Sequence, residues 1–314
     1  MRPDDGRGSP LEDHRGSERF RIMEVDHSMK RGKPSQRETR PLQTKKTLFA
    51  WAAPAGSANS PVDHTWVTTY DNRVTPYASI EEVTAAGEFY WYCWGEFHAS
   101  GGTPNNPTGF LGQQSGDLAL AQCLVEPNAD SRTVPAARGT IFTYGVDGVC
   151  HQLANQVLYA TRAQGVDPFT VCEARGYMAS TFLYTQTGLQ EEAWRNQIAK
   201  CGGQLPRELP MAAAPGTPMS GLPDDFEAHA REVLKQDDPK LLSDLLALRA
   251  DVQRFLAQRW PGVTAPDAET LNARNQHMLD QAAKLLGPQR FQAIFGFPPG
   301  QKVDLVDPRI KQQP

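Results

Sequence analysis

The chain has 314 residues, 39% of them hydrophobic, and a formal net charge of −4. This apolar share is enough to form a buried core, which excludes a chain that is disordered throughout. Without an overall basic excess we expect no nucleic-acid partner, because phosphate binding needs clustered Lys and Arg. No apolar stretch approaches the roughly 20 residues that cross a bilayer, so we expect no membrane partner either.

The cysteines bear on where the protein resides. They are odd in number, widely spaced and without a Cys-x-x-Cys pair: Cys93, Cys123, Cys150, Cys172 and Cys201. This pattern predicts ordinary interior thiols apart from Cys150, no disulfide framework, and a cytoplasmic location. The N-terminus is too polar for a signal peptide. Residues 45–53, two lysines before a short apolar run, fit a weak secretion signal or, equally well, a strand.

Composition divides the chain into four segments. Residues 1–45 are rich in charged residues, Gly, Ser and Pro, and predict a disordered tail. Residues 46–204 contain the strand-like and helical patterns of a folded α+β domain. Residues 205–223 carry several prolines among small residues and predict a linker. Residues 224–314 predict a helical C-terminal domain.

The first half of the α+β domain has mainly strand patterns. Strands are expected, from β-branched and aromatic residues, at 47–53, 64–70, 88–98 and 139–144. Ser79 can cap a short helix over residues 79–86. Residues 100–117, rich in Gly, Asn and Pro, predict a long functional loop without the spacing of a phosphate-binding loop. Residues 118–125 fit a strand or a short helix.

Helical patterns dominate the rest of the chain. Apolar residues at helical spacing predict a helix over 150–163, and Gly165 ends it. Residues 169–185 have a strand-like composition. Further helices are expected at 190–200, 225–235, 240–258, 268–286 and 288–295. Asp238 as a cap and Pro239 at the first helical position mark one of these starts clearly.

Cys150 is the candidate nucleophile. It follows the turn Gly145-Val-Asp-Gly148 and opens the predicted helix, beside backbone N–H groups that have no intrahelical acceptor. The positive end of the helix dipole lowers a thiol pKa, and a thiolate is the reactive form. The same N–H groups can stabilise the oxyanion of a tetrahedral intermediate.

A cysteine nucleophile also needs a histidine, and two of the seven are well placed. His64 begins one predicted strand and His98 ends another, so the two side chains meet if the strands are antiparallel neighbours. His151 adjoins Cys150 and points about 100° away around the helix. The others lie in the tail or in the C-terminal helices: His14, His27, His229 and His277.

The order of these residues resembles the circularly permuted NlpC/P60 family, a branch of the papain-like fold that includes lecithin:retinol acyltransferase-like enzymes. The resemblance covers roughly residues 47–165. It implies an antiparallel sheet packed on a cysteine-bearing helix, with Cys150 as nucleophile, His64 as general base, and His98 or Glu96 as the orienting residue. The family's Asn-Cys-Glu-His tetrad is absent, and this chain has Val149-Cys150-His151-Gln152 instead.

A second resemblance is to the transglutaminase-like core. The run from Gly148 through Cys150 to Ala154 is similar to the Gly-x-Cys-x-x-x-Ala start of its core helix. That family places its His and Asp after the cysteine, whereas the next histidine outside the Cys150 helix here is His229, beyond the predicted linker. Both families use the same thiol chemistry.

The sequence therefore predicts a papain-like α+β enzyme: a thiol-dependent amidase, peptidase or acyltransferase without a cofactor. Its substrate is a small molecule or peptide with an amide or thioester, and the C-terminal helices can bind a protein partner. Two other interpretations stay open. His64, His98 and Cys150 could ligate zinc. Alternatively the protein is a non-catalytic binding module, in which Trp91 and Trp94 wall a groove instead of packing in the core.

Overall fold

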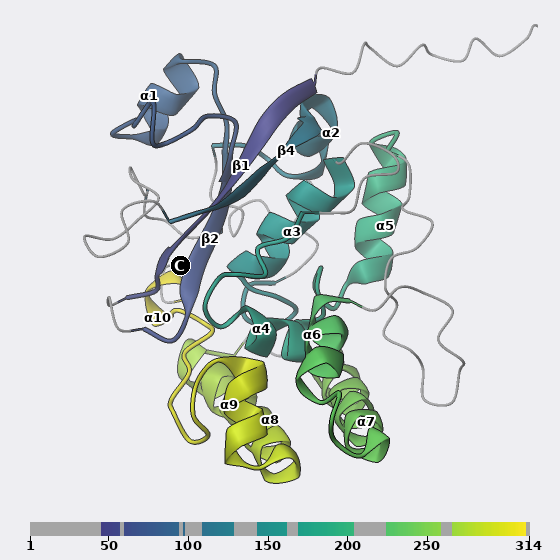
Figure 1. Cartoon of the computed structure of the whole chain (residues 1–314). Coiled ribbons are helices and arrows are strands. Elements are labelled where there is room, and N and C mark those ends of the chain that lie inside the picture. Colours follow the sequence, from purple (N-terminus) through teal and green to yellow (C-terminus); the bar gives the residue numbers. More distant parts are fainter. Residues whose placement is uncertain are drawn as a thin grey trace, which may run out of the picture. The chain divides into compact units, whose positions relative to one another are not determined.

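The computed structural model describes residues 45–56, 60–93, 97, 109–128, 143–161, 169–203, 224–258 and 266–311. The predicted linker at 205–223 and the predicted tail, apart from Lys45, lie outside these residues. All described residues belong to one compact unit (Figure 1). The two segments predicted as separate domains, 46–204 and 224–314, thus share one unit.

Among the described residues, four strands form one antiparallel sheet in the order β3-β2-β1-β4. Their bounds are β1 Lys45–Pro54, β2 Asp63–Thr68, β3 Tyr90–Trp91 and β4 Phe110–Asp117. The β1 and β2 strands confirm the two predicted from β-branched and aromatic residues, and Trp51 pairs with Trp66 across them. Since β1 lies in the core, the apolar run after Lys45 is a strand.

The other two strands differ from expectation. The aromatic strand predicted over 88–98 is a short β3, and Glu96 and His98 lie outside the described residues. The β4 strand occupies the end of the predicted loop, where two glycines and polar residues hide any strand pattern. Backbone pairing with β1 forms it, and a Cβ at Gly112 would lie 2.3 Å from the Phe169 ring.

The helices largely follow the sequence pattern. Their bounds are α1 Ile80–Ala85, α2 Leu118–Leu124, α3 Cys150–Thr161, α4 Tyr177–Tyr184, α5 Glu191–Lys200, α6 Asp225–Val233, α7 Pro239–Leu256, α8 Ala268–Leu286, α9 Pro288–Phe295 and α10 Pro308–Lys311. Ser79 and Asp238 cap α1 and α7 as predicted. None of the described helices is long and apolar enough to cross a membrane.

The α4 helix replaces strand-like material predicted at 169–185. Its aromatic and β-branched composition favours a strand, but it is buried on nearly all sides and contacts α3 and the C-terminal helices. A helix buried all round has no polar face, so periodicity cannot separate it from a buried strand.

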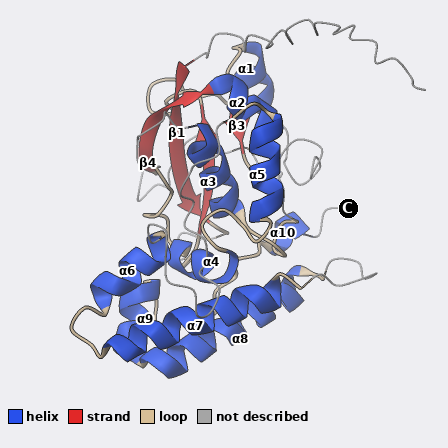
Figure 2. Cartoon of the chain, turned by 90° about the vertical axis from the view of Figure 1, so that its right-hand side faces the viewer, coloured by secondary structure: helices blue, strands red, loops and turns tan. Residues whose placement is uncertain are grey.

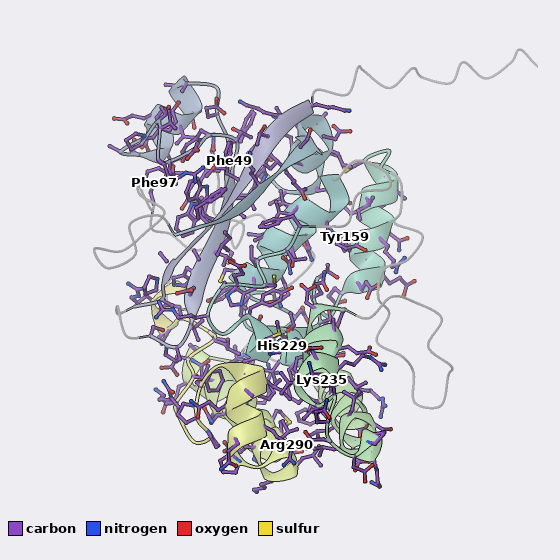
Figure 3. All side chains as sticks on the ribbon, viewed as in Figure 1. Phe49, Phe97, Tyr159, His229, Lys235 and Arg290 are labelled. Carbon is purple, nitrogen blue, oxygen red and sulfur yellow. A yellow bond between two sulfur atoms is a disulfide. The ribbon has the colours of Figure 1, made fainter. Side chains whose placement is uncertain are left out.

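The C-terminal helices pack on α4 and so join the sheet-bearing part of the unit. Figure 2 shows α6, α7, α8 and α9 gathered around α4 at one end of α3. The buried Arg249 of α7 pairs with the Asp224 carboxylate and donates to the Thr181 carbonyl of α4. On the other side of α3, the Tyr159 ring lies edge-on to Trp194 of α5, 6.0 Å between centroids (Figure 3).

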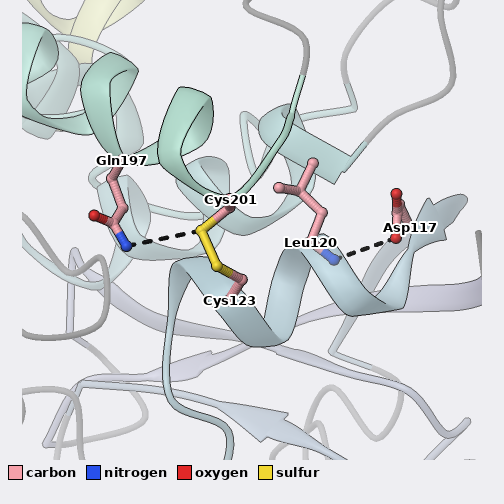
Figure 4. The surroundings of a disulfide bond; sticks show 5 residues. All are labelled: Asp117, Leu120, Cys123, Gln197 and Cys201. Carbon is pink, nitrogen blue, oxygen red and sulfur yellow. Dashed lines mark hydrogen bonds between the residues drawn. A yellow bond between two sulfur atoms is a disulfide. The ribbon is translucent and has the colours of Figure 1, made fainter. Parts of the chain in front are cut away.

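A disulfide joins α2 to the end of α5. The Cys123 and Cys201 sulfurs are bonded, with their Cα atoms 5.8 Å apart (Figure 4). The prediction that these are ordinary thiols is wrong, because sequence spacing does not show which cysteines meet in space. The bridge also removes the argument for a reducing cytoplasm, where disulfides are rare. Cys172, predicted to be interior, is exposed.

Candidate active site

A turn and a reciprocal cap place Cys150 at the start of α3. Gly145 has a φ of +78°, and a Cβ there would lie 2.7 Å from the Val306 side chain, so this tight turn requires glycine. The Val149 carbonyl accepts from the backbone N–H of Gln152, and the side-chain oxygen of Gln152 accepts from the backbone N–H of Val149 at 3.0 Å. The predicted turn and helix start are thereby confirmed.

His64 reaches Cys150 because α3 packs directly on β2. The two side chains interact electrostatically, and both residues are buried, with 3% and 2% of their surface exposed. The Asp63 carbonyl, one residue before His64, lies 3.7 Å from the Cys150 sulfur. Arg175 anchors the Asp63 carboxylate through its backbone N–H and its guanidinium. The sequence-predicted pair of Cys150 and His64 is thus brought together.

The orienting residue is one that the sequence did not single out. His64 Nε2 lies 3.0 Å from Asp307 Oδ2, although the two residues are 243 positions apart. Asp307 is buried and also accepts from the Arg309 guanidinium at 2.7 Å. With Nε2 facing the carboxylate, Nδ1 is the ring nitrogen left to act on the sulfur. His98 and Glu96, the residues expected in this role, lie outside the described residues.

The segment before Asp307 is held in place by α8 and by the turn that precedes Cys150. Asn272 of α8 forms two hydrogen bonds with the Val306 backbone, and Gln276, one helical turn on, accepts from the Val303 N–H. The Tyr144 hydroxyl accepts from the Asp307 N–H at 3.1 Å. The C-terminal helices therefore complete the site. In Figure 1, α10 lies beside one end of β2.

The electrostatics favour a thiolate and an imidazolium. Burial alone lowers the pKa of His64, but hydrogen bonds to Asp307 and Cys150 outweigh it and raise that pKa to about 9. Burial opposes ionisation of Cys150, yet the hydrogen bond to Cys93 and the charges of His151 and His64 hold its pKa well below the usual range. Hydrogen bonds from His64 and Arg309 overcome burial and lower the pKa of Asp307. Both shifts favour the ionised pair.

His151 ties the start of α3 to the neighbouring strand and helix. Because a carbonyl can only accept, its Nε2 donates to the Asp63 carbonyl at 3.0 Å. Burial lowers the pKa of His151, and its Nδ1 lies 2.9 Å from the Ser180 hydroxyl, which donates to the Tyr177 carbonyl. The ring ties α3 to β2 and to α4, and its Nε2 shares the Asp63 carbonyl with the Cys150 sulfur, so His151 lies closer to Cys150 than its place on the helix predicted.

The remaining candidates are not assembled into a site. His229 of α6, labelled in Figure 3, donates to the Ala293 carbonyl of α9 at 3.2 Å and serves helix packing. Across the described ranges, no three His, Cys, Asp or Glu side chains are arranged to hold a metal ion. The zinc interpretation depended on His98, which those ranges leave out. Trp91 is buried in the core, as expected.

No family model, curated protein or solved structure matches this chain. The resemblance to the NlpC/P60 family remains a prediction, and the functional argument rests on the geometry around Cys150.

Proposed function

We propose that the protein is a thiol-dependent amidase, peptidase or acyltransferase that works through a Cys150 acyl-enzyme. One observation carries the proposal: His64, whose Nε2 lies 3.0 Å from the buried Asp307 carboxylate, interacts electrostatically with Cys150 at the start of a helix that packs on the strand of His64. A nucleophile, a base within hydrogen-bonding reach, and a third group that orients the base are the parts that covalent acyl transfer needs.

In the first half-reaction, the Cys150 thiolate attacks the carbonyl carbon of an amide or thioester, and a carbon–sulfur bond forms. The negative charge moves to the carbonyl oxygen, where first-turn N–H groups of α3 stabilise it. The tetrahedral intermediate collapses, and the bond to the amine or thiol breaks. The His64 imidazolium gives its proton to that leaving group. No cofactor is needed for this step.

In the second half-reaction, water or an acceptor amine attacks the thioester on Cys150, and His64 takes the proton. The Cys150 thiolate leaves, and the thiolate–imidazolium pair is restored. Asp307 keeps the same ring nitrogen of His64 engaged throughout, so the other nitrogen stays on the sulfur side. Because Cys150 exposes only 2% of its surface, substrate reaches the sulfur after the site opens.

The proposal keeps the papain-like relationship and the order of the NlpC/P60 family, with one change. The cysteine-bearing helix on an antiparallel sheet supports the fold, and His64 supports the base. The orienting residue becomes Asp307, from a segment outside the range that the resemblance covers. The C-terminal helices, for which we predicted a protein partner, hold this residue.

Alkylation by iodoacetamide with peptide mapping tests the proposal. Cys172 is an internal reference, because it is an exposed free thiol. Partial burial of its sulfur raises its pKa above the usual value. At pH 6.5 we expect Cys150 to be labelled at least tenfold faster than Cys172, despite its burial, because only a thiolate reacts. In His64→Ala, Cys150 labelling should slow by about tenfold or more, while Cys172 labelling stays unchanged.

The matched control is His229→Ala, which removes a histidine of α6 that the proposal does not use. Cys150 that labels no faster than Cys172 in the wild type overturns the catalytic proposal and leaves the non-catalytic binding module. Fast labelling that is unaffected by His64→Ala refutes the role of His64. A thermal unfolding curve of each variant separates lost reactivity from lost structure.

A further inference from the structure

Arg274 of α8 lacks the counter-charge that the other arginines in the described part of the chain possess. Each of those forms an ion pair with an aspartate or glutamate: Arg73, Arg175, Arg195, Arg231, Arg249, Arg254, Arg290 and Arg309. Arg274 pairs with no carboxylate of the described residues, and its Nε atom is buried without a hydrogen-bond partner. Because withdrawing a guanidinium from water without a counter-charge costs free energy, stability does not explain this arginine.

The contacts that Arg274 does make are long and redundant. Its Nη2 lies 3.3 Å from the Gly145 carbonyl and 3.5 Å from both the Tyr184 hydroxyl and the Asn275 side-chain oxygen. A normal N–H···O bond measures about 2.9–3.0 Å. The Tyr184 hydroxyl already donates to the Gly145 carbonyl at 2.9 Å and accepts from the Asn275 amide at 2.7 Å. These groups are therefore satisfied without Arg274.

The acidic residue of the adjacent turn, Asp147, is engaged elsewhere. Its carboxylate accepts from the Thr143 backbone N–H at 3.2 Å and from the Gln190 side-chain amide at 3.2 Å. It forms no ion pair with Arg274 among the contacts of the described residues. The turn thus supplies Arg274 with a carbonyl oxygen and no contacting carboxylate.

Arg274 contacts the turn that links the two halves of the candidate active site. The Gly145 carbonyl belongs to the turn that leads into the Cys150 helix. A Cβ at Gly145 would lie 2.7 Å from the side chain of Val306, the residue before Asp307. An ion held by Arg274 would therefore lie beside the segments that place the nucleophile and the orienting carboxylate.

We propose that Arg274 binds an oxyanion, a carboxylate or a phosphate, beside the turn that positions Cys150. A guanidinium offers Nε and a neighbouring Nη as a fork that matches two oxygens of such an ion. The Arg274 side chain is partly exposed, so an anion can approach it from solvent. The anion has two possible sources, an acidic group of a substrate and a free anion. The site does not depend on the proposed function.

The experiment measures anion binding to the full chain by calorimetry at constant ionic strength. The probes are inorganic phosphate and N-acetylglycine, and the neutral N-acetylglycinamide is the reference. We expect Arg274→Met to weaken anion binding at least tenfold, because charge-assisted hydrogen bonds are lost. Arg274→Lys keeps the charge and should retain part of the affinity. Arg254→Met, at an exposed arginine of α7, is the matched control and should bind like the wild type.

A melting curve distinguishes a binding role from a structural one. Arg274→Met removes a charge without a counter-charge, so the melting temperature should not fall. Arg249→Met removes the cation of a buried ion pair and should lower it. Equal losses in the two variants would show that Arg274 serves the fold, which would overturn the proposal.

The remaining outcomes identify the source of the anion or reject the site. N-acetylglycine that binds and slows iodoacetamide labelling of Cys150 identifies an acidic group of a substrate. Phosphate binding that leaves this labelling unchanged identifies a free anion. Failure of the wild type to bind either anion, or equal binding by wild type and Arg274→Met, overturns the proposal. If Cys150 is unreactive while anion binding depends on Arg274, the proposed function fails and the anion site stands.

Discussion

The substitution Asp307→Asn tests the least expected feature of the site, a carboxylate from the end of the chain that acts on His64. Asparagine keeps the size of the side chain and an oxygen that can accept from His64 Nε2, but it removes the charge. Asp307 contributes both a hydrogen bond and an electrostatic attraction to the raised pKa of His64. Burial then acts with less opposition, so the pKa of His64 should fall towards its ordinary value of 6.5.

The size of the effect follows from that shift. With a pKa of about 9, protonated His64 exceeds the neutral form by about 30-fold at pH 7.5. With the ordinary value of 6.5, the neutral form prevails by about tenfold. Because burial opposes a Cys150 thiolate that lacks a cationic partner, the thiolate fraction falls in parallel. We expect Cys150 alkylation at pH 7.5 to slow by about tenfold or more.

The assay is the iodoacetamide rate at Cys150 from pH 5 to 9, mapped by mass spectrometry. Asp304→Asn is the matched control, because it makes the same change on the same segment at a half-exposed carboxylate that pairs only with Lys302 in the described residues. The expected result is a Cys150 profile displaced to higher pH in Asp307→Asn alone. An unchanged profile, or equal displacement in both variants, would refute the assignment of Asp307.

Three further predictions concern pH dependence and stability. Between pH 6 and 8, the wild-type labelling rate of Cys150 should stay nearly constant, because the pKa of Cys150 is lowered. The labelling rate of Cys172, whose pKa is raised, should increase about tenfold per pH unit. Equal slopes for the two cysteines would contradict a Cys150 thiolate. Arg249→Met should lower the free energy of unfolding by about 3–5 kcal/mol in urea, because it leaves buried Asp224 without its cation. The exposed Arg254→Met control should change it by less than about 1 kcal/mol, and equal losses would count against the buried pair. Replacing both Cys123 and Cys201 by Ser should lower the free energy of unfolding by about 4 kcal/mol, given their separation of 78 residues. An unchanged melting temperature would contradict the disulfide.

The sequence by itself determined the local features of the site. The glycines of the 145–148 turn and the apolar spacing after Cys150 fix a helix start, because turn conformation and helical periodicity are set by residues close in the chain. The β-branched run from His64 likewise fixed a strand. The caps Ser79 and Asp238 act within one helical turn, so they too were predictable.

Contacts between distant segments were decided only by the tertiary structure. Asp307 follows an apolar run and precedes Pro308, a pattern that marks a helix start and gives no sign of a partner 243 residues away. The same holds for the Cys123–Cys201 bridge and for β4, whose polar sequence becomes a strand by pairing with β1. Local sequence sets which conformations a segment prefers, whereas packing of the core decides which side chains meet. A catalytic arrangement depends on which side chains meet, so it depends on the packing.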